Sequence, residues 1–242
     1  MKISYGDDPN QFGELLLPES AGPHPVVVAI HGGFWRARYG LEHMRPACAD
    51  LTSLGVATWN IEYRRIGQEG GGWPGTAQDA LLGFQYLATL ATVHPLDLER
   101  VVVIGFSAGG HLALWIAGQR HRLRLDGVVA LAGVADLALA AELRLSNGVV
   151  GEFMGGGPLV LAASPIELLP TRVKTRLVHG TDDATVPIEI ARRYLTAAIA
   201  AGDDVELIAL PNTEHSPLVD VGSEAWRVGR DVVFGLLGRY HH

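Results

Sequence analysis

The sequence predicts an α/β fold, in which a mostly parallel, twisted sheet carries helices on both of its faces. Short apolar segments alternate along the chain with longer segments of helical periodicity, an order that is typical of βαβ units. The mean hydropathy of +0.19 is high, as expected when parallel strands are buried on both sides. The 242 residues fit a single domain of this class, which we expect to span residues 1–242.

Six short apolar segments are predicted to form strands. They lie at 26–30, 55–63, 100–106, 127–131, 175–179 and 205–210. Helices are expected between these strands. The helix at about 76–91 is predicted from the near-helical spacing of its leucines, and the helix at about 108–119 directly follows the strand at 100–106. These helices lie at about 76–91, 108–119, 187–201 and 222–237.

One stretch, residues 133–170, breaks this alternation between two core strands. It contains Gly148, Gly151, three consecutive glycines at 155–157 and then Pro158. An irregular segment of this size inside a compact domain is typical of a lid or a pocket wall. We therefore expect a short, partly helical, lid-like insertion beside the functional site rather than a second domain.

Charge and composition argue against several classes of partner. The formal net charge is −7 and no Lys/Arg cluster stands out, so no nucleic-acid partner is expected. The longest apolar runs, such as 101–106, are far too short to span a bilayer, so no membrane partner is expected. Residues 1–8 lack a signal-peptide pattern, which makes the cytoplasm the expected compartment. The sequence does not indicate an oligomeric state.

Cysteine and histidine usage gives no sign of a metal or a cofactor. Cys48 has no second cysteine to pair with, and we expect it to fill apolar space in a helix. The histidines do not fall at metal-ligand spacing with acidic residues, so no metal and no cofactor are assigned. His241 and His242 are either native or the stub of a tag, and they enter no functional argument.

The motif that carries chemistry is G-x-S-x-G at 105–109, centred on Ser107. It follows an apolar strand and precedes a helix, the context in which a serine occupies a tight strand-to-helix turn. The small flanking residues relieve crowding in that turn, and the helix N-terminus favours negative charge near the hydroxyl. The alternative is a Gly-rich turn that only packs the helix on the sheet, and the context favours a nucleophile.

A serine hydroxyl needs a base within hydrogen-bond reach, and that base needs an orienting acceptor. On such a turn the acid and then the histidine come from further along the chain. The histidine is His215, after the strand at 205–210, and the acid follows 175–179, where Asp182 and Asp183 compete. The loop is similar to the hydrolase pattern G-x-x-D-x-x-V-P, which places the acid at Asp183. Asp182 stays as the alternative, or as a turn residue that bonds its own backbone.

An oxyanion hole is also required, because the tetrahedral intermediate carries charge on the former carbonyl oxygen. Ala108, directly after the serine, supplies one backbone N–H. The second donor is expected from the loop after the first core strand, which reads His-Gly-Gly-Phe-Trp at 31–35.

Taken together, these motifs resemble α/β-hydrolases of the esterase/lipase group. Residues 31–35 look like the H-G-G-x-W element of the branch that includes kynurenine formamidases and small carboxylesterases. Other matching pieces are Tyr63-Arg64, Ser-Ala-Gly-Gly-His at 107–111 and Ala-Ser-Pro at 163–165. The resemblance runs from about residue 26 to residue 215. It implies that Gly33, Phe34 and Ala108 present the oxyanion N–H groups.

Five further residues receive structural or open assignments. His31 is expected to brace the loop at 31–35, here called the oxyanion loop, and His111 to pack or hydrogen-bond. His179 is expected to fix the loop that carries Asp182 and Asp183, here called the acid loop. Trp35 and Trp73 are possible pocket walls, and burial in the core is the equal alternative for both.

These residues and the resemblance imply a serine hydrolase that cleaves a small carboxylic ester through an acyl-enzyme intermediate. The same machinery can split a formamide, so an arylformamidase is the first alternative. A non-catalytic binding protein that keeps the fold is the second, but it predicts a broken triad. Short acyl chains are expected, because few residues are left to cover the deep apolar tunnel that a long chain needs.

Overall fold

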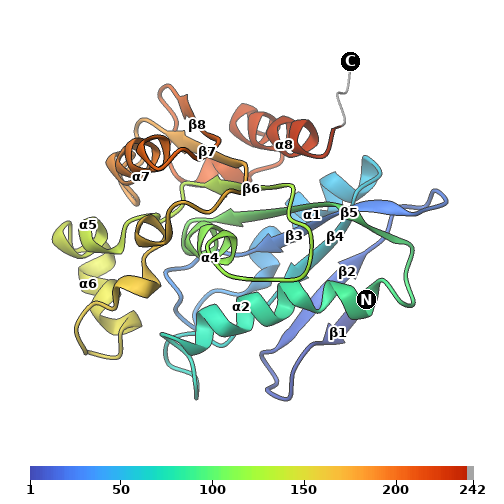
Figure 1. Ribbon diagram of the computed structural model, residues 1–242, viewed down its shortest axis with the longest axis horizontal. Helices are drawn as coiled ribbons and strands as arrows, with labels where there is room; N and C mark the ends of the chain where they lie inside the picture. Colours follow the sequence, from blue (N-terminus) through green and yellow to red (C-terminus); the bar gives the residue numbers. More distant parts are fainter. Residues whose placement is uncertain (239–242) are drawn as a thin grey trace.

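The computed structural model describes residues 1–238, so the terminal His241 and His242 lie outside the described residues. Figure 1 shows one sheet at the centre of the molecule. Its eight strands follow the order β1-β2-β4-β3-β5-β6-β7-β8, with β1 and β2 antiparallel to their neighbours and the others parallel. The strands are β1 Lys2–Ser4, β2 Phe12–Leu16, β3 His24–Ile30, β4 Ala57–Ile61, β5 Leu96–Phe106, β6 Gly127–Leu131, β7 Thr175–Gly180 and β8 Val205–Leu210.

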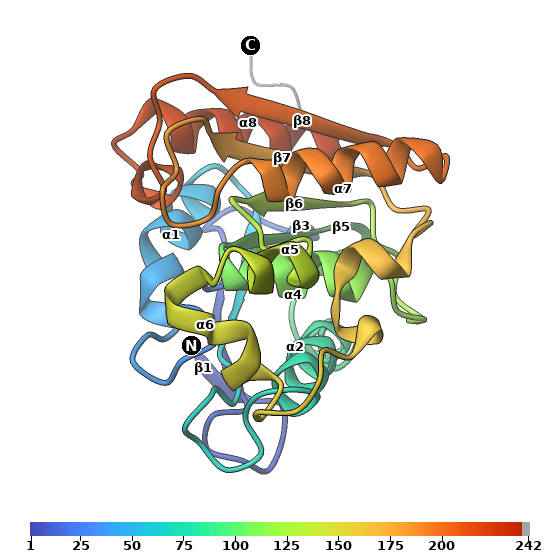
Figure 2. The same ribbon diagram turned by 90° about the vertical axis from the view of Figure 1, so that its left-hand side faces the viewer.

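Helices connect these strands and cover both faces of the sheet, as the sequence predicts (Figures 1 and 2). The α-helices are α1 Arg45–Ser53, α2 Gly75–Gln85, α3 Leu87–Leu90, α4 Ala108–Ala117, α5 Leu137–Glu142, α6 Leu145–Phe153, α7 Glu189–Ala200 and α8 Glu224–Leu236. The 3₁₀ helices are η1 Leu41–Met44, η2 Leu161–Ala163, η3 Pro165–Leu168 and η4 Ser216–Val219. None of the helices within residues 1–238 combines the length and the apolar character that crossing a bilayer requires.

The core lies in two layers because the side chains of each central strand alternate between the faces of the sheet. In β3, Val26, Val28 and Ile30 pack in the layer that holds α2, α4 and part of α7. Val27 and Ala29 pack in the other layer, with α1 and α8. All five side chains are fully buried. This double burial explains the continuous apolar runs and the high mean hydropathy.

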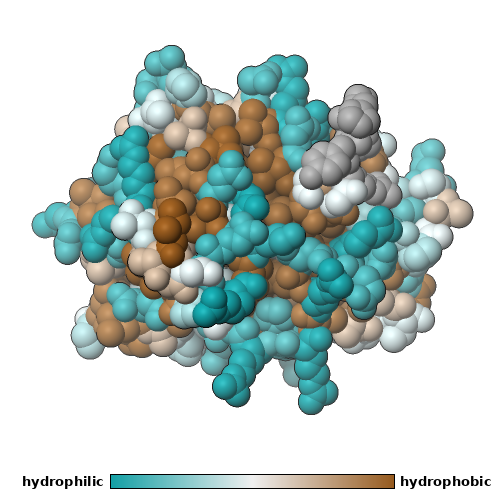
Figure 3. Space-filling view, turned by 45° about the horizontal axis from the view of Figure 1, so that its top comes forward, coloured by the Kyte–Doolittle hydropathy of each residue, from teal (hydrophilic) through white to brown (hydrophobic). Residues whose placement is uncertain are grey.

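The two edges of the sheet differ from its centre. Within residues 1–238, β8 is the last strand in the order and pairs with β7 alone, and its Leu207 and Ile208 are half-buried. Figure 3, which brings the top of the molecule forward, shows apolar residues gathered there among polar ones. At the opposite edge the sequence analysis missed β1 and β2. These strands are short, and only alternate residues of β2 are fully buried, so they lack the apolar run that identified the central strands.

One helix also differs from its prediction. The helix expected at about 76–91 ends at Gln85, and a separate turn of helix, Leu87–Leu90, follows it. Leu87 and Leu90 are nonetheless buried in the same apolar layer as α2. Of the leucines whose spacing predicted this helix, Leu81 is half-buried and Leu82 is 40% exposed. Hydrophobic periodicity therefore placed only part of the buried face, and it placed the helix boundary poorly.

The insertion, residues 133–170, is partly helical and contains α5, α6, η2 and η3. It packs against the segments that follow β3 and β4. The backbone N–H of Trp73 donates to the Phe153 carbonyl at 2.8 Å. The Arg36 guanidinium binds the Glu152 carboxylate through Nη2 at 2.7 Å. The parallel strands β3 to β8 all finish at the same end of the sheet, and the insertion follows β6. It therefore lies at the end of the sheet where the candidate site residues follow the strands.

Candidate active site

Ser107 occupies a strained turn between β5 and α4. Its backbone has φ 56° and ψ −117°, a conformation that L-residues rarely adopt and that costs about 1–3 kcal/mol. The turn has no room for larger flanking residues. A Cβ on Gly105 would lie 2.1 Å from the carbonyl oxygen of Gly109, and one on Gly109 would lie 2.1 Å from that of Ile30. The G-x-S-x-G spacing is therefore a steric requirement of this elbow.

The acid loop after β7 meets the histidine loop after β8. The Asp183 Oδ2 atom accepts a hydrogen bond from His215 Nδ1 at 2.6 Å, the contact that the sequence analysis anticipated. Asp182 is exposed, and its carboxylate accepts instead from the Thr181 hydroxyl at 2.9 Å. Of the two competing aspartates, the structure brings Asp183 to the histidine.

Backbone contacts fix this pair of loops. The Asp183 Oδ1 atom accepts from the backbone N–H groups of Thr185 and Val186 at 2.9 and 2.8 Å, which orients the carboxylate. The Asp182 N–H donates to the Thr213 carbonyl at 3.0 Å and so ties the acid loop to the histidine loop. Gly180 makes the close approach possible, since a Cβ there would lie 2.0 Å from that same carbonyl oxygen.

The Asp183 carboxyl is held ionised. Burial by itself would raise its pKa, but the contacts with His179 and His215 and the backbone N–H of Val186 outweigh burial and hold the pKa well below its usual range. An ionised acceptor at Nδ1 keeps the proton of His215 on that nitrogen, which leaves Nε2 free to take another.

The ring of His215 contacts the residue that precedes Ser107. The ring of His215 packs on that of Phe106, with centroids 4.6 Å apart. Ser107 is only 2% exposed, whereas His215 is half-buried, so the site admits solvent from the histidine side. The structure thus gathers Ser107, Asp183 and His215 at one end of the sheet, although they come from three separate loops.

The loop after β3 forms a tight turn beside the serine. The Arg36 N–H donates to the Gly33 carbonyl at 3.0 Å, and the two central residues, Phe34 and Trp35, have φ of 52° and 56°. Such values are costly for bulky side chains, and they belong to turns of the I′ type. A Cβ on Gly32 would lie 3.0 Å from the Ser107 Cβ. Gly32 therefore borders the serine, and the expected oxyanion residues Gly33 and Phe34 follow it directly in the chain. Ala108 follows the serine itself.

Of the two alternatives left open for Trp35, a pocket wall or the core, the structure supports the core. Its side chain is fully buried and stacks on Phe153, with ring centroids 4.5 Å apart. Trp73 is half-buried and packs edge-on against Trp115 at 5.8 Å. Phe153 of the insertion, which the sequence analysis did not single out, joins both tryptophans into one aromatic cluster.

The histidines that were given structural roles are all engaged. His111 Nε2 donates to the Ala163 carbonyl at 2.8 Å and so ties α4 to the insertion. His179 Nε2 donates to the Val186 carbonyl at 2.7 Å, which fixes the acid loop as expected. Cys48 is buried in α1, and burial raises the pKa of its thiol to about 12, which makes it an inert core residue. Among the described residues, no three His, Cys, Asp or Glu side chains converge in a way that suits a metal ion.

Sequence reasoning overlooked one buried residue next to the site, Glu62. It follows β4 and contacts His31 Nε2 at 2.8 Å from a position only 3% exposed. The parallel register pairs Ile30 with Ile61, so the residues after them are neighbours. An acidic residue directly after one strand and a histidine directly after the next were the available signal.

The sheet order, the elbow at the end of β5 and the linked acid and histidine loops define an α/β-hydrolase. Within this class, the BD-FAE family model matches residues 14–197, about three quarters of the chain, and the protein belongs to that family.

Among curated proteins, the chain is similar to isoprenylcysteine alpha-carbonyl methylesterase ICME of Arabidopsis thaliana. The two are 25% identical over 268 residues, covering 96% of this chain and 59% of the relative. Esterase LipC of Mycobacterium tuberculosis is 26% identical over 246 residues, covering 88% of this chain and 59% of the relative. The chain thus spans less than two thirds of the length of these relatives.

Solved structures share the fold over nearly the whole chain. An acetyl ester-xyloside bifunctional hydrolase from Caldicellulosiruptor lactoaceticus superposes with a TM-score of 0.82 at 22% identity, covering 100% of this chain and 97% of the other. Esterase B from Lactobacillus rhamnosis gives a TM-score of 0.84 at 21% identity, with coverages of 98% and 85%.

Proposed function

We propose that this protein is a serine hydrolase that cleaves small carboxylic esters through an acyl-enzyme intermediate. The observation that carries the proposal is the hydrogen bond of 2.6 Å between Asp183 and His215, beside a serine on a strained elbow. Family membership supports the same class of reaction, and several relatives are named as esterases.

In the first step the Ser107 oxygen attacks the ester carbonyl while His215 Nε2 takes the hydroxyl proton. The Asp183 carboxylate stabilises the imidazolium that forms. The carbonyl oxygen becomes an oxyanion, which the N–H groups of Gly33, Phe34 and Ala108 stabilise. Ala108 is well suited to this, because a residue in the first turn of a helix has no intrahelical acceptor for its N–H.

In the second step His215 returns the proton to the departing alkoxide, and the acyl group stays on Ser107. Water then enters, His215 takes one of its protons, and the resulting hydroxide attacks the acyl-enzyme. The intermediate collapses to a carboxylic acid, and the proton returns to Ser107. Each half-reaction uses the same base and the same oxyanion hole.

A formamide would follow the same steps, but nothing in the names of the relatives reported above supports the arylformamidase alternative. Retention of all three triad members also speaks against a non-catalytic binding protein. We infer a small-molecule ester as substrate.

The test is labelling of the nucleophile. A fluorophosphonate probe is expected to modify Ser107 and no other serine, and Ser107→Ala is expected to lower kcat for p-nitrophenyl acetate by about 10³–10⁶-fold. N-formylkynurenine is assayed beside the ester, and the faster reaction shows whether the enzyme prefers a formamide or an ester bond. Labelling of another serine, or a mutant that keeps most of its activity, would overturn the mechanism.

A further inference from the structure

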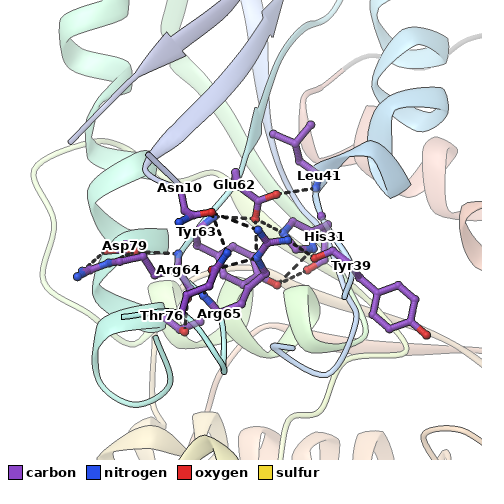
Figure 4. Close-up of polar contacts among 12 residues, drawn as sticks. Asn10, His31, Tyr39, Leu41, Glu62, Tyr63, Arg64, Arg65, Thr76 and Asp79 are labelled. Carbon is purple, nitrogen blue, oxygen red and sulfur yellow. Dashed lines mark hydrogen bonds and ion pairs between the residues drawn. The ribbon is translucent and has the colours of Figure 1, made fainter. Parts of the chain in front are cut away.

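Both ring nitrogens of His31 face acceptor oxygens in a dry environment. Nε2 lies 2.8 Å from the Glu62 Oε1 atom, and Nδ1 lies 2.7 Å from the carbonyl oxygen of Gly32. The imidazole is fully buried and stacks on the ring of Tyr63, with centroids 4.3 Å apart. An imidazole held at both nitrogens and on one face has a fixed orientation (Figure 4).

That orientation also fixes a peptide plane. The bond between Gly32 and Gly33 is trans, so its C=O and N–H point in opposite directions. Because His31 Nδ1 holds the Gly32 carbonyl, the Gly33 N–H is directed away from the imidazole. The preceding peptide is held as well, since the Tyr63 hydroxyl donates to the His31 carbonyl at 2.9 Å. Gly32 contacts the serine turn, so this backbone borders the reacting centre.

Glu62 anchors the imidazole to the rest of the fold. Its Oε1 atom also accepts from the Tyr63 N–H at 3.0 Å and pairs with Arg65, and its Oε2 atom accepts from the Leu41 N–H at 3.0 Å. Burial alone would raise the pKa of Glu62, but the hydrogen bond from His31 and these other partners lower it overall, so the group is a carboxylate. Figure 4 shows how these contacts converge from the ends of β3 and β4 and from the start of η1.

We propose that Glu62 is a positioning residue for the oxyanion hole. Through His31 it holds the Gly32–Gly33 peptide so that the Gly33 N–H is aimed at the developing oxyanion. The inference rests on the proposed function, because it concerns the same reaction. Glu62 and His31 are given no proton transfer, and both are buried away from the surface (3% and 0% exposed).

The test substitutes Glu62→Gln, which keeps the shape and removes the charge. An amide has one acceptor oxygen where the site needs two, so either the Leu41 N–H or His31 Nε2 faces an NH₂ group. The loop then relaxes, and kcat is expected to fall about 10- to 100-fold with KM nearly unchanged, because a misaimed donor weakens only the transition state. The inhibition constant of a trifluoromethyl ketone, which forms an oxyanion on the serine, is expected to rise by the same factor.

Asp79→Asn is the matched control. Asp79 is an equally buried carboxylate (1% exposed) that accepts from Arg64 and Gln11 and contacts no residue of the oxyanion loop. Its substitution is expected to lower thermal stability while leaving kcat within about twofold. Equal kcat losses in both variants would mean that Glu62 serves stability alone and would overturn the inference.

A double-mutant cycle with His31→Phe completes the test. Phenylalanine retains the stacking on Tyr63 and loses both hydrogen bonds, so kcat is expected to fall at least as far as in Glu62→Gln. Since Glu62 acts through His31, adding Glu62→Gln to His31→Phe is expected to change kcat little, whereas additive losses would overturn the inference. If Glu62→Gln does not fold, His31→Phe decides alone. A wild-type protein without ester hydrolysis or Ser107 labelling refutes the proposed function instead.

Discussion

Asp183→Asn is expected to reduce kcat for p-nitrophenyl acetate by about 10⁴-fold, and the contacts of the carboxylate explain why. Two backbone N–H groups, those of Thr185 and Val186, hold Oδ1, so the asparagine oxygen takes that place. The amide NH₂ then occupies the Oδ2 position, 2.6 Å from His215 Nδ1. Nδ1 must become an acceptor, the proton moves to Nε2, and Nε2 can no longer accept the Ser107 proton.

The alternative amide orientation is unfavourable. It would restore an acceptor to His215 but would turn the NH₂ group against the two backbone donors, each of which costs about 1–3 kcal/mol when buried without a partner. A loss of about 5 kcal/mol of transition-state stabilisation corresponds to the 10⁴-fold decrease. The control is Asp182→Asn, because the exposed Asp182 carboxylate accepts from the Thr181 hydroxyl and not from His215; this variant should leave kcat within about twofold. If the two variants ranked in the opposite order, the assignment of the acid would be wrong.

Two further predictions concern stability and substrate range. Burial lowers the pKa of His111 to about 4, below the value of about 6.5 in an unfolded chain, so the stability it confers is complete above pH 6.5 and is lost as the pH falls through 4. The free energy of unfolding, measured with urea, is expected to fall by on the order of 3 kcal/mol over this range, and the decrease should largely vanish in His111→Gln. If the variant kept the pH dependence of the wild type, His111 would not be its cause. For p-nitrophenyl esters, kcat/KM is expected to peak at acetate or butyrate, because the buried rings of Trp35 and His111 pack against Phe153 of the insertion and leave little room for a long acyl chain. A maximum at octanoate or beyond would show a deeper pocket.

The sequence predicted the central sheet, the serine elbow and the pairing of Asp183 with His215 well, because these features leave strong local signals. A strand buried on both faces is an apolar run, and an elbow around Ser107 allows only glycine at two nearby positions. The choice between Asp182 and Asp183 depended on one residue of spacing, and the structure places Asp183 beside His215. Such features can be predicted from the sequence because each is determined within a few neighbouring residues.

Features that depend on contacts between distant segments could not be predicted from the sequence in the same way. The choice between pocket and core for Trp35 depended on its stacking with Phe153, which lies more than a hundred positions later. β2 was overlooked because its pairing with β4, and not an apolar run, makes it a strand. Glu62 lies beside His31 only once the parallel register of β3 and β4 is known.

The oxyanion loop combines these two kinds of determinant. Its sequence alone does not favour its shape, since Phe34 and Trp35 both adopt positive φ at a cost of about 1–3 kcal/mol each. The compensation comes from outside the loop. The Ile66 N–H donates to the Trp35 carbonyl at 2.7 Å, and Arg36 binds Glu152 of the insertion. Since each of these partners lies in another segment, transferring residues 31–36 to a different scaffold would not transfer the geometry. A turn held against its own preference in this way cannot relax when charge develops on the substrate, which is the property an oxyanion hole requires.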